Sequence, residues 1–352
     1  MREPHGGEVE WDISRKYNIP IDKITSFATT VSYIKPKIPV KKYSKYIHRY
    51  PPMSFKPLND SVAKLYGAKE ENIILGSGTE ELIYLFFSAL GKGEAIIPVP
   101  TYNSYTDAAA RYSISRLVSH GSDFELDIGK ISEAVSRRTK AIVICNPNNP
   151  TGRLYRKSDL IELAKISKDN GATLLVDENY MWFVEKKLRY TMADFIGKYP
   201  VFVLNGISKS FSAPGLRVGW GVGQKLFIDT LNGFKTPTTI GTMNLFLANA
   251  LLENMGYAEK SAKRVISSKK RFYSRLRGIK SLRVFPSDAN FFLIKILDRK
   301  INSTGLFRDL AKRGIAIRDC ANLKGLNDRF IRVTVRSDSD NSMLINAIKR
   351  LL

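Results

Sequence analysis

The chain has 352 residues, a length beyond which one hydrophobic core usually divides, so we expect one large and one smaller domain that share a cleft. A hydrophobic content of 43% excludes an intrinsically disordered chain, and the two cysteines, Cys145 and Cys320, lack the spacing of a disulfide framework or a zinc site. The formal net charge of +23 concentrates anions near the surface, so nucleic acids and phosphorylated substrates both have to be considered.

The polar residues 1–11 carry both charge signs, and no uncharged apolar run approaches the length of a membrane span. These features predict a soluble protein with no membrane partner. The two cysteines without disulfide or zinc spacing predict a cytoplasmic protein with no metal site. Of two basic runs, the second has helical spacing and no base-reading motif, which favours a solvated helix face and makes a nucleic-acid partner unlikely. The runs are Lys35, Lys37, Lys41, Lys42 and Lys45, and then Lys263, Arg264, Lys269, Lys270, Arg271, Arg275 and Arg277.

Short apolar runs alternate with amphipathic segments between about residues 71 and 222, which predicts an α/β fold with a mostly parallel sheet covered by helices on both faces. A long helical pattern from about residue 240 and later apolar strands predict a smaller α+β domain. We expect residues 1–40 to form an N-terminal arm associated with the small domain, 41–240 the large domain and 241–352 the small domain. The predicted strands lie at 72–75, 95–99, 141–145, 173–176, 201–204, 218–222, 290–296 and 330–335.

Polar or glycine-rich segments follow these strands at residues 76–80, 100–102, 146–152, 177–180 and 208–217. Because ligands of open α/β sheets bind outside the carboxyl ends of the strands, we expect the five segments to converge on one cleft. The first, with Gly78, Thr79 and Glu80, opens an apolar helix, so its free backbone N–H groups and the helix dipole can hold a phosphate. Glycine turns of this kind are also common without a ligand.

Lys209 is the candidate for a reactive amine. A lysine just after a strand can be desolvated enough to lower its pKa, which makes it a nucleophile toward an aldehyde. Arg217 can return to the same pocket through a Pro-Gly turn, where its planar guanidinium suits a phosphate. Residues 208–219 resemble the lysine signature of the class I and II aminotransferases and their decarboxylase relatives. The resemblance implies the fold type I of enzymes dependent on pyridoxal 5'-phosphate (PLP), with Lys209 as the Schiff-base lysine and Ser208 beside the cofactor.

Five further motifs match the same family in chain order. The resemblance implies that Tyr102 stacks on the pyridine ring and that Asn149 and Tyr180 hydrogen-bond the ring oxygen. A carboxylate beside the pyridine nitrogen keeps it protonated, so that the ring accepts the electrons released when a bond to Cα breaks, and Asp177 is the candidate for this role. Arg332 resembles the arginine that binds the substrate carboxylate. Taken singly, these residues also have structural interpretations. Tyr102 fits a core tyrosine and Asn149 an ordinary Asn-Pro turn, while Asp177 fits a helix cap and Arg332 a solvated strand position.

Three segments are similar to the threonine-phosphate decarboxylases of cobalamin biosynthesis: residues 5–7, 49–51 and, above all, 318–326. The resemblance implies a lyase that removes CO2 from L-threonine O-3-phosphate. It also implies that Tyr50 reaches the cofactor phosphate of the neighbouring subunit, which makes the protein a homodimer with shared active sites. The residues expected to bind the anionic amino-acid substrate are His5, Arg318, Arg332 and Arg336.

Two alternatives stay open. Residues 26–32 lack the Asn-rich loop that those decarboxylases usually carry, and Tyr180 and Gly206 are more typical of aminotransferases. These departures favour an aminotransferase acting on histidinol phosphate or on an acidic or aromatic amino acid. The net charge permits a third interpretation, a basic nucleic-acid-binding protein that retains an inactive PLP fold.

Overall fold

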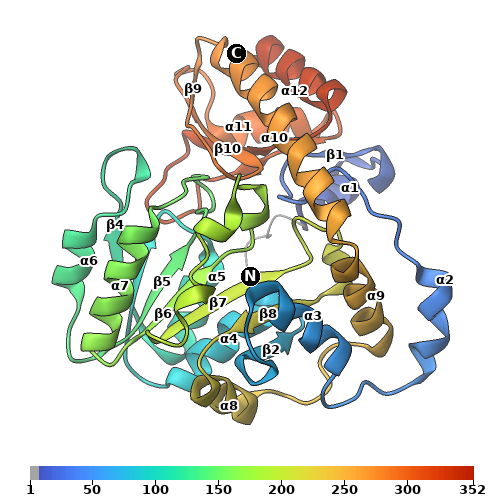
Figure 1. The fold of residues 1–352 in the computed structure, drawn as a ribbon. Helices are drawn as coiled ribbons and strands as arrows, with labels where there is room; N and C mark the ends of the chain where they lie inside the picture. Colours follow the sequence, from blue (N-terminus) through green and yellow to red (C-terminus); the bar gives the residue numbers. More distant parts are fainter. Residues whose placement is uncertain (1–7) are drawn as a thin grey trace.

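The computed structural model describes residues 8–352. A seven-stranded sheet lies at its centre in the order β2-β8-β7-β6-β5-β3-β4, and only β8 runs antiparallel to its neighbours (Figure 1). This arrangement confirms the predicted α/β fold with a mostly parallel sheet. The strands are β2 (Ile73–Gly76), β3 (Glu94–Val99), β4 (Ile114–Ser119), β5 (Thr139–Cys145), β6 (Thr173–Asp177), β7 (Val201–Gly206) and β8 (Gly219–Val222).

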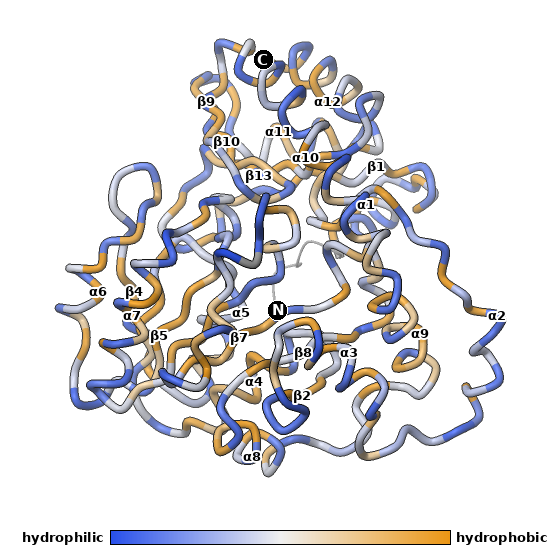
Figure 2. Tube along the Cα trace, viewed as in Figure 1, coloured by the Kyte–Doolittle hydropathy of each residue, from blue (hydrophilic) through white to orange (hydrophobic). Residues whose placement is uncertain are grey.

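Two hydrophobic cores cover the two faces of this sheet, because successive side chains of a strand point to opposite sides. Ile142 and Ile144 of β5 pack in the core that includes α3 (Lys56–Tyr66), α6 (Ile128–Ala134), α7 (Lys157–Asp169) and α9 (Thr242–Glu253). Val143 and Cys145 pack on the other face with α4 (Gly78–Leu90), α5 (Asn103–Tyr112) and α8 (Lys225–Phe234). Figure 2 shows the hydrophobic colouring concentrated along the central strands.

The strand β4 has no counterpart among the predicted strands. It lies at the edge of the sheet, paired only with β3, and most of its side chains are exposed. An edge strand buries little surface, so its sequence lacks the continuous apolar run that marks the central strands. The other six strands were predicted to within two residues at each end.

A four-stranded antiparallel sheet in the order β12-β13-β10-β9 forms the small domain, which lies at one end of the molecule in Figure 1. The N-terminal arm joins this domain, because Thr25 of β1 pairs with Ile315 of β11, and Val9 and Ile13 of α1 pack against Ala316. The elements are α1 (Glu8–Tyr17), β1 (Thr25–Ser26), β9 (Leu282–Val284), β10 (Phe291–Ile296), α11 (Ser303–Ala311), β11 (Ile315–Ala316), β12 (Arg318–Asp319), β13 (Phe330–Thr334) and α12 (Asp338–Leu351).

Helix α9 packs in the core of the seven-stranded sheet, where Leu245 and Leu251 share a cluster with Leu58 of α3. The expected domain boundary at residue 241 stays a prediction. The long helix α10 (Met255–Arg277) then leads into the small domain, where Phe272 contacts Phe292. Helical periodicity places α9 correctly as a helix but does not reveal which core it joins. The short helices are η1 (Ile21–Lys23), α2 (Val40–Tyr43), η2 (Ser44–His48), η3 (Glu70–Asn72), η4 (Ser122–Phe124), η5 (Met181–Phe183), η6 (Lys187–Arg189), η7 (Ala193–Phe195) and η8 (Pro214–Leu216).

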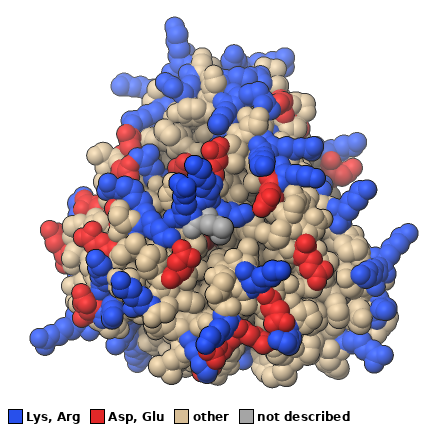
Figure 3. Space-filling model, viewed as in Figure 1, with Lys and Arg blue, Asp and Glu red and all other residues tan. Residues whose placement is uncertain are grey.

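The excess of basic side chains is spread over the surface. Lysine and arginine are distributed across the whole visible face in Figure 3, and acidic residues lie among them. On α10, Val265, Phe272 and Leu276 are buried while most of the basic residues of the second run are exposed, as expected for a solvated helix face. Among residues 8–352, no helix is both long enough and apolar enough to cross a membrane.

Candidate active site

The carboxyl ends of the parallel strands and one edge of the small domain enclose a cavity of about 290 Å³. All five of the strand-end segments that were predicted to converge contribute to its wall. The N-terminal arm adds residues 28–31, and the small domain adds two arginines. The sequence-predicted residues that line the cavity are Thr79, Glu80, Tyr102, Asn149, Asp177, Tyr180, Ser208, Lys209, Arg217, Arg318 and Arg332.

Lys209 follows β7 and extends its amine into this cavity. Its carbonyl accepts a hydrogen bond from the backbone N–H of Ser32 at 3.0 Å, which fixes the lysine against the N-terminal arm. Burial, followed by the positive charge of Arg332, lowers the pKa of Lys209 to about 8, while Asp177 acts in the opposite direction. At neutral to mildly alkaline pH a useful fraction of this amine is therefore unprotonated and nucleophilic.

Asp177 ends β6 and is held by three hydrogen bonds. The hydroxyl of Tyr105 donates to Oδ2 at 2.7 Å, and the backbone N–H and Nδ2 of Asn179 donate to Oδ1 at 3.0 and 2.8 Å. Burial raises the pKa of the Asp177 carboxyl, while these hydrogen bonds and the nearby Lys209 favour the ionised form. A carboxylate held in this way can bind a protonated ring nitrogen.

Tyr105 is a functional candidate that the sequence analysis missed. It lies three residues after Tyr102 on the first turns of α5, and the two rings meet edge-on with centroids 5.7 Å apart. Residues three apart on a helix share a face, so a second tyrosine at this spacing was the available signal. Further residues around the cavity were also missed, namely Thr30, Asn179, Cys145 and Leu323.

Glu80 positions an aromatic side chain. Its carboxylate accepts hydrogen bonds from the hydroxyl of Tyr102 at 3.0 Å and from that of Ser104 at 2.7 Å. Both donors belong to the segment that leads into α5, so Glu80 links the start of α4 to the start of α5. Since both carboxylate oxygens accept hydrogen bonds from these hydroxyls, Glu80 fits a role in fixing the plane of the Tyr102 ring better than direct contact with a phosphate.

The glycine turn and Arg217 form a close pair. Gly78 has φ +75°, and a Cβ at this position would lie 2.6 Å from Nη2 of Arg217. A Cβ on Gly219 would lie 2.6 Å from the backbone nitrogen of Thr79, so both glycines permit an approach that no other residue would allow. The guanidinium of Arg217 therefore lies beside the free N–H groups at the start of α4, an arrangement suited to a phosphate.

Arg332 links the small domain to the catalytic loops. It is 6% exposed, and its guanidinium donates to Oδ1 of Asn149 and to the carbonyl of Ala28. Its Nε is buried and has no hydrogen-bond partner among residues 8–352. Tyr180 completes the group, because its hydroxyl lies 2.9 Å from Oγ1 of Thr30 and 3.4 Å from Nδ2 of Asn149. A buried guanidinium with unused donor capacity is suited to binding an anion.

The other three residues that were expected to bind the substrate differ in their position relative to the cavity. Arg318 lines the cavity, and its Nη2 donates to Asn322 at 2.9 Å. Arg336 does not line the cavity; it contacts Asp340 and the carbonyl of Ser26, at 3.1 and 3.0 Å. Arg336 thus supports the N-terminal loop of the site, and its expected contact with a substrate stays a prediction. His5 lies outside the described residues.

Tyr50 also lies away from this cavity. Its side chain is 96% exposed, on the segment between η2 and α3. This exposure is compatible with the expected contact to a second subunit, which stays a prediction. No group of three or more His, Cys, Asp or Glu side chains within residues 8–352 has the arrangement of a metal site.

These residues fit PLP. The turn at Gly78 lets the Arg217 guanidinium approach the start of α4, where the two can hold a phosphate, Lys209 offers an amine to the aldehyde, and Asp177 offers a carboxylate to the ring nitrogen. The family model described as aminotransferase class I and II matches residues 30–351. The chain therefore belongs to the class I and II aminotransferase family, a family of PLP-dependent enzymes.

Relatives of known name carry two activities. A histidinol-phosphate aminotransferase from Methanococcus aeolicus is 30% identical over 98% of this chain and 95% of its own length. A protein from Caldanaerobacter subterraneus subsp. tengcongensis, named provisionally as a threonine-phosphate decarboxylase, is 29% identical over 87% of this chain and 83% of its own length. Proteins named for each of the two activities considered from the sequence are therefore among the relatives of this chain.

Solved structures agree with the fold. The histidinol-phosphate aminotransferase from Clostridium acetobutylicum matches with a TM-score of 0.84 and 26% identity, over 93% of this chain and 99% of its own. The histidinol-phosphate aminotransferase from Sinorhizobium meliloti, in complex with PLP, matches with a TM-score of 0.87 and 18% identity, over 97% and 95%. This chain accordingly has the fold of type I PLP enzymes.

Proposed function

We propose that the protein is a PLP-dependent decarboxylase that releases CO2 from L-threonine O-3-phosphate, a step of cobalamin biosynthesis. The observation that carries the proposal is the position of two arginines in one cavity. Arg318 and Arg332 stand directly opposite each other on the paired strands β12 and β13, and both line the cavity that Lys209 enters. Two adjacent guanidinium groups suit a short substrate that carries both a carboxylate and a phosphate.

The residues around the cavity would have different roles in such a reaction. Bound PLP supplies a protonated ring that accepts the electron pair released when a bond to the substrate Cα breaks. Asp177 provides the negative charge at the ring nitrogen, and Tyr102, fixed by Glu80, provides the stacking surface. Arg318 and Arg332 would hold the anionic groups and so fix the orientation in which the substrate is bound, which decides the bond to Cα that breaks. The Nζ of Lys209 then returns a proton to Cα.

The test is the release of CO2 by purified holoenzyme given L-threonine O-3-phosphate and no keto acid. We expect turnover, and we expect Arg318→Gln to lower kcat/KM about 10- to 100-fold, the loss of one charge-assisted hydrogen-bonding group. Arg313→Gln, a change at an exposed arginine of the same segment, serves as the matched control. Failure to release CO2 in the presence of intact bound cofactor would overturn the proposal.

The second candidate is an aminotransferase for histidinol phosphate or an acidic or aromatic amino acid. It is supported by the M. aeolicus relative and by Tyr180, whose hydroxyl is held beside Asn149 and Thr30. The two activities use the same residues and differ in the orientation of substrate. An amino-acid panel assayed separately for CO2 and for conversion of the cofactor to its amine form distinguishes them, since only amino transfer leaves the amine form.

A further inference from the structure

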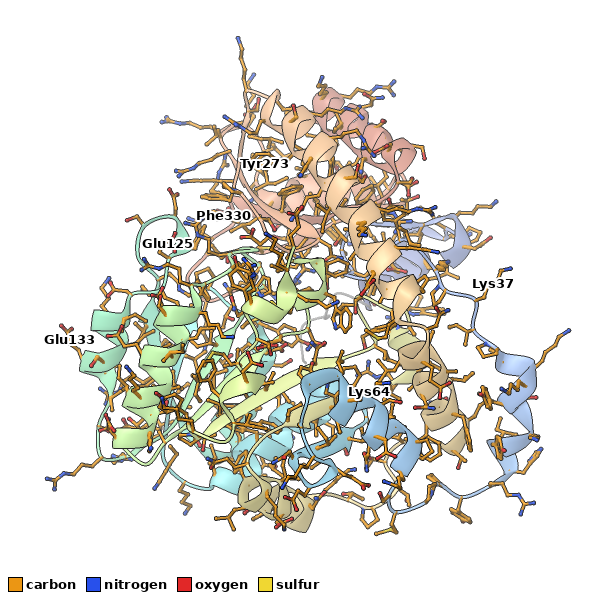
Figure 4. The ribbon with its side chains drawn as sticks, in the orientation of Figure 1. Lys37, Lys64, Glu125, Glu133, Tyr273 and Phe330 are labelled. Carbon is orange, nitrogen blue, oxygen red and sulfur yellow. The ribbon has the colours of Figure 1, made fainter. Side chains whose placement is uncertain are left out.

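A second cavity of about 420 Å³ lies between the two domains. On one side are α10 and the turn between β9 and β10, and on the other are Leu154, residues 183–185 and Tyr190 of the large domain. No described residue lines both this cavity and the active site. Its walls are partly apolar and include four aromatic side chains, one of which, Tyr273, is labelled on α10 in Figure 4. The aromatic residues are Phe183, Tyr190, Tyr273 and Phe292.

Lys269 is a largely buried lysine that lines this cavity. The Nζ of Lys269 donates to the carbonyl of Ser287 at 2.9 Å, whereas an ammonium group can donate three hydrogen bonds. Burial lowers the pKa of Lys269 to about 8, the carboxylates of Asp288 and Glu185 act against this, and Lys270 adds to it. Lys270 itself is exposed and lies 3.9 Å from Glu185. Lys269 therefore has donor capacity left inside a partly apolar cavity.

We propose that this cavity binds a small amphipathic carboxylate as an effector, with its carboxylate on Nζ of Lys269 and its apolar body against the aromatic walls. The volume is within the range of small-molecule sites and well above the about 150 Å³ that holds a benzene ring. A single negative charge suits the site better than a phosphate dianion, because two carboxylates, Glu185 and Asp288, lie beside the one recessed ammonium.

The same turn connects this cavity to the catalytic loop. The backbone N–H of Asp288 donates to the carbonyl of Gly152 at 2.8 Å, and a Cβ on Gly152 would lie 2.1 Å from Oγ of Ser287. Gly152 closes the loop that carries Asn149, which contacts Arg332. A carboxylate that takes Lys269 away from the Ser287 carbonyl would thus act on a turn that is packed directly against the Asn149 loop.

The experiment uses holoenzyme and the probe 3-phenylpropionate, with binding measured by calorimetry. A dissociation constant on the order of millimolar is expected for a ligand of this size. Lys269→Met should weaken binding at least about tenfold, as should replacing the probe by uncharged 3-phenylpropan-1-ol. Lys263→Met, an exposed lysine of α10 that does not line the cavity, should leave the affinity unchanged, and Arg332→Gln in the active site should change it far less than Lys269→Met does. Binding that is lost in Arg332→Gln but kept in Lys269→Met would overturn the site.

Two further measurements keep the proposal testable if Lys269→Met folds poorly. Acylation of Lys269 in the unaltered holoenzyme, read by mass spectrometry, should be slowed by the probe, whereas acylation of the exposed Lys263 should not. The visible spectrum of the bound cofactor should shift as the probe saturates the cavity, and the shift should disappear in Lys269→Met. Equal acylation rates with and without saturating probe, or binding without any spectral change, would contradict an effector site. Neither the acylation rates nor the spectral shift depends on whether the enzyme decarboxylates its substrate or transfers an amino group.

Discussion

The charges around Lys209 set the pH at which its amine is reactive. Burial and Arg332 bring its pKa to about 8, so below this pH the group is mostly protonated and above it mostly neutral. We therefore expect the rate constant for PLP uptake by the apoenzyme to rise about tenfold per pH unit below pH 8 and to level off above it. Stopped-flow absorbance with apoenzyme measures this profile.

Arg332→Gln provides the control for this pH profile. Removing a positive charge beside the amine favours its protonated form, so the pKa of Lys209 rises and the midpoint of the profile moves to higher pH. A midpoint that stays in place in this variant would show that burial alone sets the reactivity of the amine. Lys225→Ala, which removes an exposed lysine paired with Asp229, should leave the profile unchanged.

The hydroxyl of Tyr105 supports the ionised form of Asp177. Tyr105→Phe removes a 2.7 Å hydrogen bond to a buried carboxylate, which raises the pKa of Asp177 and weakens its hold on a protonated ring. We expect kcat to fall about 10- to 100-fold while the cofactor stays bound, since Asn179 still donates twice. The bound cofactor's absorbance should also titrate differently with pH, whereas Tyr112→Phe on the same helix should change neither. An unaltered kcat in Tyr105→Phe would assign this tyrosine a purely structural role.

At the level of elements, the turn before α4 can be tested with two glycines that both have a positive φ. Gly78 and Gly91 have φ +75° and +67°, so alanine costs about 1–3 kcal/mol of backbone strain at each position. A Cβ at Gly78 would also meet Arg217, whereas nothing lies within 4 Å of one at Gly91. Gly78→Ala should therefore weaken PLP binding at least about tenfold, measured by equilibrium dialysis. Gly91→Ala should lower only Tm, and equal PLP affinities in the two variants would contradict a phosphate site here.

The sequence predicts elements well where burial imposes a pattern. The central strands are buried on both faces, so they appear as apolar runs, and their carboxyl ends meet at one edge for reasons of topology. The exposed strand β4 leaves no such run. Tyr105 could be inferred from its spacing to Tyr102, but Thr30 could not, because its contact with Tyr180 joins residues that are 150 positions apart.

For the whole molecule, the site exists only where the N-terminal arm, the large domain and the small domain meet. Arg332 contacts both Ala28 and Asn149, and the backbone carbonyls of residues 26–30 accept hydrogen bonds from the small domain. Such contacts are not encoded in a local pattern. Arg336 shows this, since its hydrogen bond to the carbonyl of Ser26 joins residues that are 310 positions apart.

A second copy of the chain is needed for a complete site if Tyr50 contacts the cofactor phosphate of the neighbouring subunit. Tyr50, Ile47 and Met53 are 96%, 66% and 78% exposed, an unusual cluster of large apolar side chains on one segment and one suited to a subunit contact. The segment is anchored to its own subunit, because Thr242 donates to the carbonyl of Arg49 at 2.6 Å. Tyr50→Phe should therefore lower cofactor affinity without altering the fold.

Mixing two defective chains tests the shared site directly. In a hybrid dimer of Tyr50→Phe and Lys209→Ala chains, one site has an intact lysine together with an intact tyrosine from its neighbour, and the other has neither. Half of randomly formed dimers are hybrids with one complete site of two, so co-expression should restore about one quarter of the normal activity per chain at limiting PLP. If both residues served the same subunit's site, no hybrid would contain a complete site, and the mixture would show only the sum of the two separate activities.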